Sequence, residues 1–317
     1  MSSFLTKRLT YMIIILLAAS MMIFFLYAMT PGDFISGNLK LSPERKAELR
    51  EIYGLNKPIL ERYGNWLGNA LHGNFGYSLA QQKPVLTLFN EYIWNSFLLA
   101  IVSTFLTWLI AVIIGVVAAY KQYSWFDTLV MVVIFAAMSV PSFFIGLYLI
   151  KIAAVDLKWL PPGGMLNTGS NTTGMEYVKE VLQHMTLPVI VMTLLGLGSL
   201  TRYFRSNMID VIQQDYIRTA RAKGLKERKV LFTHALRNAL LPAITLVGFE
   251  LPALFGGSLI IEKIFNWPGI GQLYMLSFSL RDYPLLMGFT MLIAILSVIG
   301  TLLSDILYRI ADPRVKV

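Results

Sequence analysis

Few side chains in this sequence have the type and spacing that catalysis requires. There is no cysteine, and the three histidines, His72, His184 and His234, stand far apart. The sequence contains no His-Glu-x-x-His zinc motif, no Gly-x-Ser-x-Gly nucleophile turn and no Gly-x-x-x-x-Gly-Lys-Ser/Thr phosphate loop. We therefore expect no enzyme activity, no metal site and no ATP site within this chain.

The densest cluster of charge instead suggests docking. Residues 202–239 contain nine Lys and Arg against three acidic residues. Apolar residues recur there at helical spacing up to Ala220, and Gly224 then interrupts the pattern, since glycine readily takes the left-handed conformation that ends a helix. A second amphipathic helix is predicted over 227–240. Two short helices joined at a glycine would form a rigid docking element, although a basic loop resting on anionic lipid headgroups explains the same charge.

The elements that hold this segment are long apolar blocks. Apolar residues make up 56% of the chain and charged residues 14%, below the ~25% charged of soluble domains. A bilayer core needs about 20 mainly apolar residues per helix. The sequence predicts an all-α polytopic membrane protein with six such helices, over 9–29, 95–120, 126–150, 185–201, 240–261 and 288–310. The first block is long for a cleaved signal peptide, the other interpretation of its basic, apolar start.

The distribution of basic residues predicts the orientation. Lys and Arg gather in 1–8, 121–125, 202–239 and 311–317, next to helix ends, whereas the other connecting segments are nearly neutral. The positive-inside rule therefore places both termini in the cytoplasm. The net charge of +9 follows from this topology and needs no nucleic acid as a partner. The three histidines would then lie on both sides of the membrane, where they cannot share one metal.

Two segments are predicted outside. Residues 30–94 read as a helical cap, with Ser42-Pro43 starting one helix, Gly54 ending it and Pro58 starting a second, amphipathic helix. Residues 151–184 contain Trp-Leu-Pro-Pro-Gly-Gly at 159–164, which requires irregular backbone.

The basic segment closely resembles the signature loop of ABC-importer permeases. The matching stretches are Tyr-Ile-Arg-Thr-Ala-Arg-Ala-Lys-Gly-Leu at 216–225, His-Ala-Leu-Arg-Asn at 234–238 and Leu-Pro at 241–242. Arg-Thr-Ala at 218–220 replaces the commoner Glu-Ala-Ala, as is usual in the dipeptide, oligopeptide and nickel branch. Within that branch the chain is most similar to the first permease subunit of the oligopeptide importers of Gram-positive bacteria. Gly-Asn-Phe-Gly-Tyr-Ser at 73–78, Ser-Val-Pro-Ser-Phe at 139–143, Asn-Trp-Pro-Gly-Ile-Gly at 266–271 and Asp-Pro-Arg at 312–314 extend the resemblance along the chain.

The resemblance implies a type I permease fold in a bacterial cell membrane: an N-terminal helix (1–29) against a partner, the external segment (30–94), a five-helix core (95–310) with a coupling loop (207–241), and a cytoplasmic tail (311–317). It implies a second homologous permease, two cytoplasmic ATPases that bind ATP and Mg²⁺, an external peptide-binding lipoprotein, and surrounding membrane lipid. Peptides would be imported by alternating access. The alternatives are dipeptides or nickel on the same machinery, or a secondary transporter. The coupling helix would place the following residues against the ATPase: Tyr216, Arg218, Thr219, Ala220, Arg221, Lys223, Gly224, Leu225, Arg228 and His234.

Breaks in the membrane helices mark candidate gate positions. Pro141 removes a helical donor and crowds the preceding turn, and Ser139 and Ser142 could repair the local hydrogen bonding. The fifth helix contains Pro252 and then Gly256-Gly257. A static kink in a packed bundle explains each break equally well.

Glu250 is the one ionisable residue deep inside a predicted span. A charge at a helix centre costs about 2.5–3.5 kcal/mol on insertion scales, so we expect Glu250 to face a pore or a partner. It could meet a peptide amino terminus or an arginine, or be a protonated, buried carboxyl.

The segment after the fifth helix is predicted, from the resemblance, to dock the external binding protein through Glu262, Trp267, Pro268 and Gly269. A solvated ion pair between Glu262 and Lys263 is the alternative interpretation of that pair.

Overall fold

The computed structural model describes residues 2–37 and 42–311, so all but the first residue of the predicted tail 311–317 lies outside the described residues. The described chain is almost entirely helical, and its one sheet is a short antiparallel hairpin of β1 (Tyr77–Ser78) and β2 (Lys83–Pro84). Five single helices are long and apolar enough to cross a membrane, and one bent helix pair brings the number to six. The expected all-α membrane architecture is therefore present.

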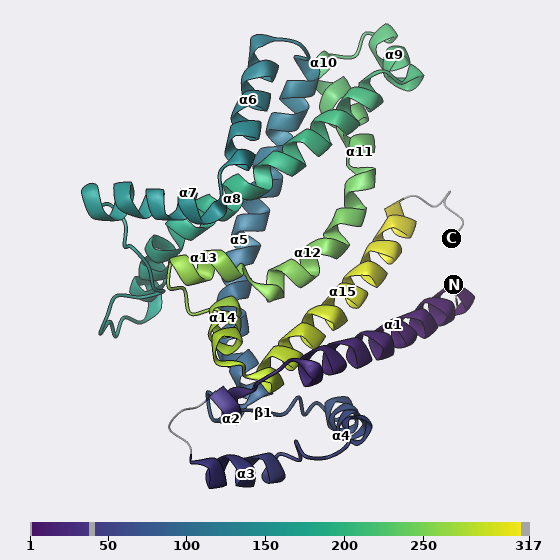
Figure 1. Cartoon of the computed structure of the whole chain (residues 1–317). Helices are drawn as coiled ribbons and strands as arrows, with labels where there is room; N and C mark the ends of the chain where they lie inside the picture. The colour runs from purple at the N-terminus through teal and green to yellow at the C-terminus, as the bar shows by residue number, and fades with distance from the viewer. Residues whose placement is uncertain (1, 38–41, 312–317) are drawn as a thin grey trace.

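The bundle is built around two helix pairs. α5 (Val85–Tyr120) packs along α8 (Gly174–Ile212), and α12 (Ile244–Gly256) packs along α15 (Tyr283–Ala311). α1 (Ser2–Met29) lies beside α15 on the outside of this core (Figure 1). An ion pair of 2.9 Å between Arg8 Nη1 and Asp305 Oδ2 joins one end of the α1–α15 contact, and the rings of Tyr27 and Tyr283, 5.7 Å apart, join the other.

The third predicted membrane helix is not continuous. α6 (Trp125–Ser139) ends at Val140-Pro141, and α7 (Ser142–Leu149) leaves at 97° to it before a π-helical segment, η1 (Ile150–Asp156). Figure 1 shows α7 projecting sideways from the bundle. The expectation of a kinked but continuous helix over 126–150 was wrong. Ser139 Oγ donates to the Phe135 carbonyl, and Pro141 becomes the residue before a new helix instead of bending the old one.

The other boundaries also moved. The predicted fourth helix, 185–201, is the middle of the 39-residue α8, whose end supplies the start of the predicted coupling loop. α5 begins at Val85 instead of residue 95, and α15 at Tyr283 instead of residue 288. The predicted fifth helix is interrupted at Gly257, with a φ of +67°, and resumes as α13 (Leu259–Ile264). α14 (Ile270–Leu280) then leads back to α15.

The segment predicted to be external forms two helices at the predicted positions, after the short α2 (Phe34–Gly37). In α3 (Pro43–Ile52), the Ser42 side chain caps the Arg45 N–H, and Gly54 takes a φ of +62° just beyond its end. α4 (Ile59–Leu71) buries Trp66 against Phe24 of α1. The β1–β2 hairpin that follows was not predicted. Ser78 Oγ, at 2.5 Å, and the Ala80 N–H, at 3.1 Å, donate to the buried Asp282 carboxylate and fix the hairpin to the start of α15.

Candidate functional site

The predicted coupling helices form a compact unit at one end of the molecule. α9 (Asp215–Ala222) is followed by α10 (Glu227–Lys229), the π-helical segment η2 (Val230–Ala235) and α11 (Leu236–Ala239). Gly224, with a φ of +75°, turns the chain between α9 and α10, as the sequence predicted. The second helix is less regular than expected because η2 interrupts it. Figure 1 places α9 at the opposite end of the molecule from α3 and α4.

α9 is anchored by its apolar face. Ile217 is fully buried and Ala220 nearly so, in a cluster that includes Val116 and Ala119 near the end of α5 and Met208 near the end of α8. Close packing of this kind resists deformation, because a shift of one side chain displaces its neighbours. Movement of α9 would therefore be transmitted to the ends of α5 and α8.

The outer face of the unit carries most of the predicted coupling residues. Ala220 is buried, and Leu225 and His234 are half-buried. Arg221 bridges the Gly224 turn by donating from Nη2 to Glu227 Oε1 at 2.7 Å, and this partner raises the pKa of the Arg221 guanidinium. The exposed members of the predicted set are Tyr216, Arg218, Thr219, Arg221, Lys223, Gly224 and Arg228. The sequence thus presents a mostly basic surface on a fixed frame.

A buried ion pair holds the neighbouring helix α6 to α8. Arg205 donates from Nε and Nη2 to the two oxygens of Asp127, each at 2.6 Å. The Asp127 carboxylate also accepts from the Tyr123 N–H at 3.0 Å, which fixes the turn between α5 and α6. Asp127 is only 4% exposed, so removing Arg205 would leave a buried carboxylate without its cationic partner. Sequence reasoning missed this pair, because its members stand 78 residues apart.

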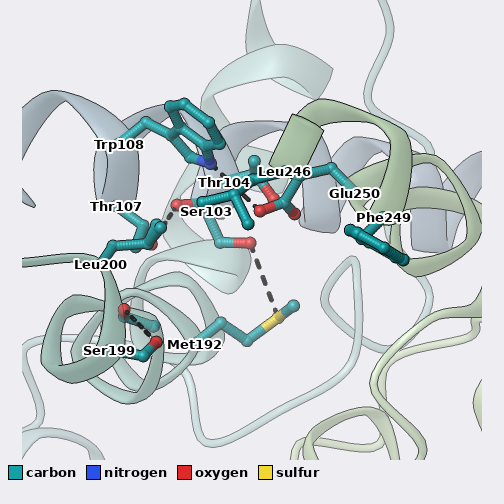
Figure 2. Close-up of a pocket in the computed structure, with 11 residues that line it drawn as sticks. Ser103, Thr104, Thr107, Trp108, Met192, Ser199, Leu200, Leu246, Phe249 and Glu250 are labelled. Carbon is teal, nitrogen blue, oxygen red and sulfur yellow. Dashed lines mark hydrogen bonds between the residues drawn. The ribbon is translucent and has the colours of Figure 1, made fainter. Parts of the chain in front are cut away.

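A groove of about 280 Å³ opens between α5, α8 and α12. Its one charged lining side chain, among the described residues, is Glu250. Figure 2 shows the carboxylate of Glu250 on α12 facing the indole of Trp108 on α5, and Trp108 Nε1 donates to Glu250 Oε1 at 3.1 Å. The remaining lining residues are Ser103, Thr104, Thr107, Met192, Gly196, Ser199, Leu200, Leu246 and Phe249.

Glu250, which we expected to face a pore or a partner, lines this groove, and the other groove residues were not predicted. Ser103, Thr104, Thr107 and Trp108 recur at one- and four-residue steps, which places them on one face of α5. That hydroxyl-rich stripe in an apolar helix was the available signal. Its hydroxyls are largely satisfied within their own helix, since Thr107 Oγ1 donates to the Ser103 carbonyl at 2.7 Å and Ser103 Oγ to Ala100 at 3.0 Å.

The remaining predicted gate residues do not line this groove. Ser139, Pro141 and Ser142 lie at the break between α6 and α7. Pro252 lies inside α12. Gly256, at the end of α12, faces α15 so closely that a Cβ atom there would stand 2.9 Å from Ile293 Cδ1. The structure therefore brings only Glu250 of the predicted pathway set to the groove.

Glu262 is the centre of a buried hydrogen-bond cluster. It is 0% exposed, and one oxygen accepts from Ser96 Oγ at 2.7 Å and from the Ser258 N–H at 3.2 Å. The other accepts from the Gly271 N–H at 2.8 Å and the Gln272 N–H at 3.2 Å, at the start of α14. An α-helix start favours a carboxylate, because its first N–H groups have no partner within the helix. Glu262 thereby ties α5, α13 and α14 together.

Three glycines make room for this carboxylate. A Cβ atom at Gly257 would lie 2.3 Å from Glu262 Oε1, one at Gly269 2.3 Å from Oε2 and one at Gly271 2.8 Å from Oε2. Their positions around Glu262 in the sequence were the signal for this site.

The predicted docking role of these residues needs correction. Glu262 and Trp267 are both fully buried, Gly269 is buried and Pro268 half-buried. Trp267 Nε1 donates to the Asn95 carbonyl at 3.0 Å, and Asn95 Nδ2 donates to the Pro268 carbonyl at 2.8 Å. A solvated ion pair of Glu262 with Lys263 is also ruled out, because the Glu262 carboxylate is occupied by other donors. These side chains hold the segment to α5, and neither Glu262 nor Trp267 is available for a partner in this conformation.

Comparison with known proteins places the chain among membrane components of transport systems. Residues 111–317 match the family described as binding-protein-dependent transport system inner membrane component, and residues 1–100 match the N-terminal family of the same membrane component. The oligopeptide transport system permease protein AppB of Bacillus subtilis is 42% identical over the full length of both chains. The di/tripeptide transport system permease protein DppB of Pseudomonas aeruginosa is 35% identical over all of this chain and 99% of its own.

Solved structures support the same fold at lower identity. Inward-facing structures of the MetNI methionine ABC transporter align with a TM-score of 0.54 at 16% identity, covering 71% of this chain and 96% of the matched chain. The likeness at this identity concerns the arrangement of the helices.

Proposed function

Since the chain belongs to the family of binding-protein-dependent transport system inner membrane components, we propose that it is the membrane-spanning permease subunit of an ATP-driven peptide importer. The observation that carries this proposal is the 42% identity, over the full length of both chains, with an oligopeptide permease. That identity exceeds the 35% found with a di/tripeptide permease, so we propose oligopeptides as the transported substrates. The chain is a translocation component of a bacterial membrane and not itself an enzyme.

The family implies two kinds of partner, an ATPase and a substrate-binding protein. The finer assembly we propose is one second homologous permease, two cytoplasmic ATPases and one external lipoprotein. ATP and Mg²⁺ would be held by the ATPases, because this chain has no phosphate-binding loop. The apolar outer face of α1, which exposes Ile13, Ile14 and Met22, suits either lipid or the second permease.

A mechanical link connects the proposed ATPase contact to the groove. α9 packs on the ends of α5 and α8, and the same two helices carry Trp108, Ser103 and Met192 along the groove wall. A displacement of α9 by the ATPases would therefore move two of the three groove walls relative to α12. Alternating access in this scheme is a change in which end of the groove is open, driven through α5 and α8.

The proposed contact with the binding protein lies at the opposite end. There, α3 and α4 stand together with the β1–β2 hairpin (Figure 1). In the 263–268 segment, Lys263 and Asn266 are exposed and available to a partner, while the buried Glu262 and Trp267 fix the segment to α5.

Affinity purification tests this assembly. The chain would be tagged, solubilised in mild detergent and its co-purifying proteins identified by mass spectrometry. We expect a second permease, an ATPase and a substrate-binding lipoprotein. Recovery of the chain alone or with copies of itself, with no ATPase in any of several detergents, would contradict the proposal and favour a secondary transporter.

A further inference from the structure

The groove contains a carboxylate side chain for which the described residues provide no ion-pair partner. Glu250 lies in the middle of α12, opposite Trp108 of α5. Trp108 is twelve residues from the end of α5 at Tyr120, which is about 18 Å at the helical rise of 1.5 Å per residue. The hydrocarbon core of a bilayer is about 30 Å thick, so, with Tyr120 as the edge of the predicted span 95–120, we expect the carboxylate near the middle of the membrane.

The surroundings of Glu250 satisfy one acceptor site and leave others open. The indole N–H of Trp108 binds Oε1 at 3.1 Å and orients the carboxylate. No Lys or Arg of residues 2–37 and 42–311 forms an ion pair with Glu250. A carboxylate has about four acceptor positions, so capacity remains on the side that borders the groove.

The rest of the groove is built to hold a small apolar group next to that carboxylate. Its hydroxyls Ser103, Thr107 and Ser199 donate to backbone carbonyls of their own helices, which reduces their demand for water. Met192, Leu246 and the exposed Phe249 supply apolar surface around the opening (Figure 2). A volume of about 280 Å³ is at the lower limit for whole-ligand pockets, so it suits one end of a longer molecule.

The chemistry of a fitting cation can be narrowed. Ca²⁺ and Mg²⁺ require six or more oxygen ligands, and no group of three or more metal-ligating side chains occurs in the described chain. A primary ammonium requires only a few acceptors, and a single carboxylate provides the charge. Every linear peptide with an unmodified amino terminus carries such a group, which is mostly protonated near pH 7 because its pKa is about 7.7–8.0.

We propose that Glu250 is a subsite for the α-ammonium group of the transported peptide, with Trp108 as its positioning residue and the apolar rim receiving the first side chain. This inference rests on the proposed function and adds to it a point of recognition inside the membrane. One fixed carboxylate at this place would serve peptides of many sequences, because it reads the amino terminus and not the side chains.

The test uses the complete importer in proteoliposomes, with its own binding protein, and compares initial rates of ATP-driven uptake. The two probes are an oligopeptide without Lys, Arg or His and its N-acetylated form; a third peptide, N-acetylated but containing one Lys, separates an α-ammonium from a side-chain ammonium. For each variant, the uptake rate of the free peptide is divided by that of its N-acetylated form, and this ratio measures the preference for a free amino terminus. Because the binding protein is the same in every sample, its own preference cancels when the ratio of a variant is divided by that of the wild type.

We expect Glu250→Gln to lower the preference for the free amino terminus about tenfold, as befits the loss of one charge-assisted contact. Glu250→Asp, which retains the charge, should keep most of the preference. Trp108→Phe keeps an aromatic side chain and leaves the Glu250 carboxylate in place, but it removes the indole N–H. It should lower the preference by a smaller factor. Glu176→Gln, at an exposed carboxylate outside the groove, is the matched control and should leave the ratio unchanged.

Three results would overturn the inference. One is a ratio unchanged by Glu250→Gln in an importer that assembles and hydrolyses ATP. Another is an equal loss of uptake for both probes in Glu250→Gln and Glu250→Asp, which would indicate a structural role or an ion pair with another subunit. The third is a loss specific to the lysine-containing peptide. Failure of the proposed function is distinguishable, since the wild type would then show no ATP-driven uptake of any probe.

Discussion

Replacing Glu262 by glutamine should destabilise the protein although it changes only one atom of the side chain. Each carboxylate oxygen accepts two hydrogen bonds. Three of the four donors are backbone N–H groups, which cannot accept, and the fourth is the Ser96 hydroxyl. The amide NH₂ of glutamine must replace one oxygen. If the NH₂ group faces Gly271 and Gln272, it lies against two backbone N–H donors and none of these groups finds an acceptor. If it faces Ser258 and Ser96, the Ser258 N–H loses its acceptor, and the Ser96 oxygen is already accepting from the Ile270 N–H at 2.8 Å.

The size of the effect follows from the donors left unpaired. One or two buried N–H groups without a partner cost about 1–3 kcal/mol each, so we expect a loss of about 2–4 kcal/mol. Since 1 kcal/mol moves the melting temperature of a domain of 150–250 residues by about 2–4 °C, the midpoint should fall by roughly 4–16 °C. The assay is thermal unfolding of the purified protein in detergent, followed by size-exclusion chromatography of the heated samples.

Two further variants control this prediction. Glu176→Gln makes the same chemical change at an exposed site and should shift stability by less than about 0.5 kcal/mol. Gly269→Ala would place a Cβ 2.3 Å from Glu262 Oε2 and 2.4 Å from Ser96 Oγ and should destabilise the wild type. It should do less harm when Glu262 is already alanine, because one of these two clashes is then removed and Ser96 loses its carboxylate partner. A midpoint for Glu262→Gln equal to that of the wild type, or strictly additive effects of Gly269→Ala and Glu262→Ala, would refute the proposed buried cluster.

Three other predictions follow from the same structure. Gly224→Pro should abolish ATPase co-purification and uptake without preventing membrane insertion, because proline cannot adopt the φ of +75° there. Gly37→Ala is the control, because an added Cβ at that position meets open space. ATPase docking retained in Gly224→Pro would contradict the coupling role. Arg205→Ala should destabilise the protein by about 3–5 kcal/mol in thermal unfolding because it leaves the buried Asp127 unpaired, and the combined Arg205→Gln and Asp127→Asn variant should lose less than the sum of its parts. Deleting residues 40–71 should leave the chain inserted but remove most uptake that depends on the binding protein, and full uptake by that variant would exclude a docking role for α3 and α4.

The membrane architecture and the coupling unit could be predicted from the sequence because their signals are local. Apolar length identified the spans, Ser42-Pro43 and Gly54 delimited α3, and Gly224 separated α9 from α10. Each of these depends on the conformation of a few consecutive residues and on no distant contact.

The 97° break at Pro141 could not be predicted in this way. A proline in a helix produces either a kink or an end, and the packing of the next segment decides between them. In α7 the buried Gly146 allows close approach to Phe265, where an added Cβ would stand 3.4 Å from the ring. That contact lies more than a hundred residues away in the sequence, as does the Ser96–Glu262 bond that makes Glu262 buried.

The most direct test of the central claim is peptide uptake by the reconstituted importer. Proteoliposomes would contain this chain with its second permease and ATPases, with the binding protein outside and ATP and Mg²⁺ on the ATPase side. The account predicts uptake that requires ATP hydrolysis and the binding protein, and that Gly224→Pro abolishes. Uptake driven by a proton or sodium gradient without ATP would contradict it and identify a secondary transporter.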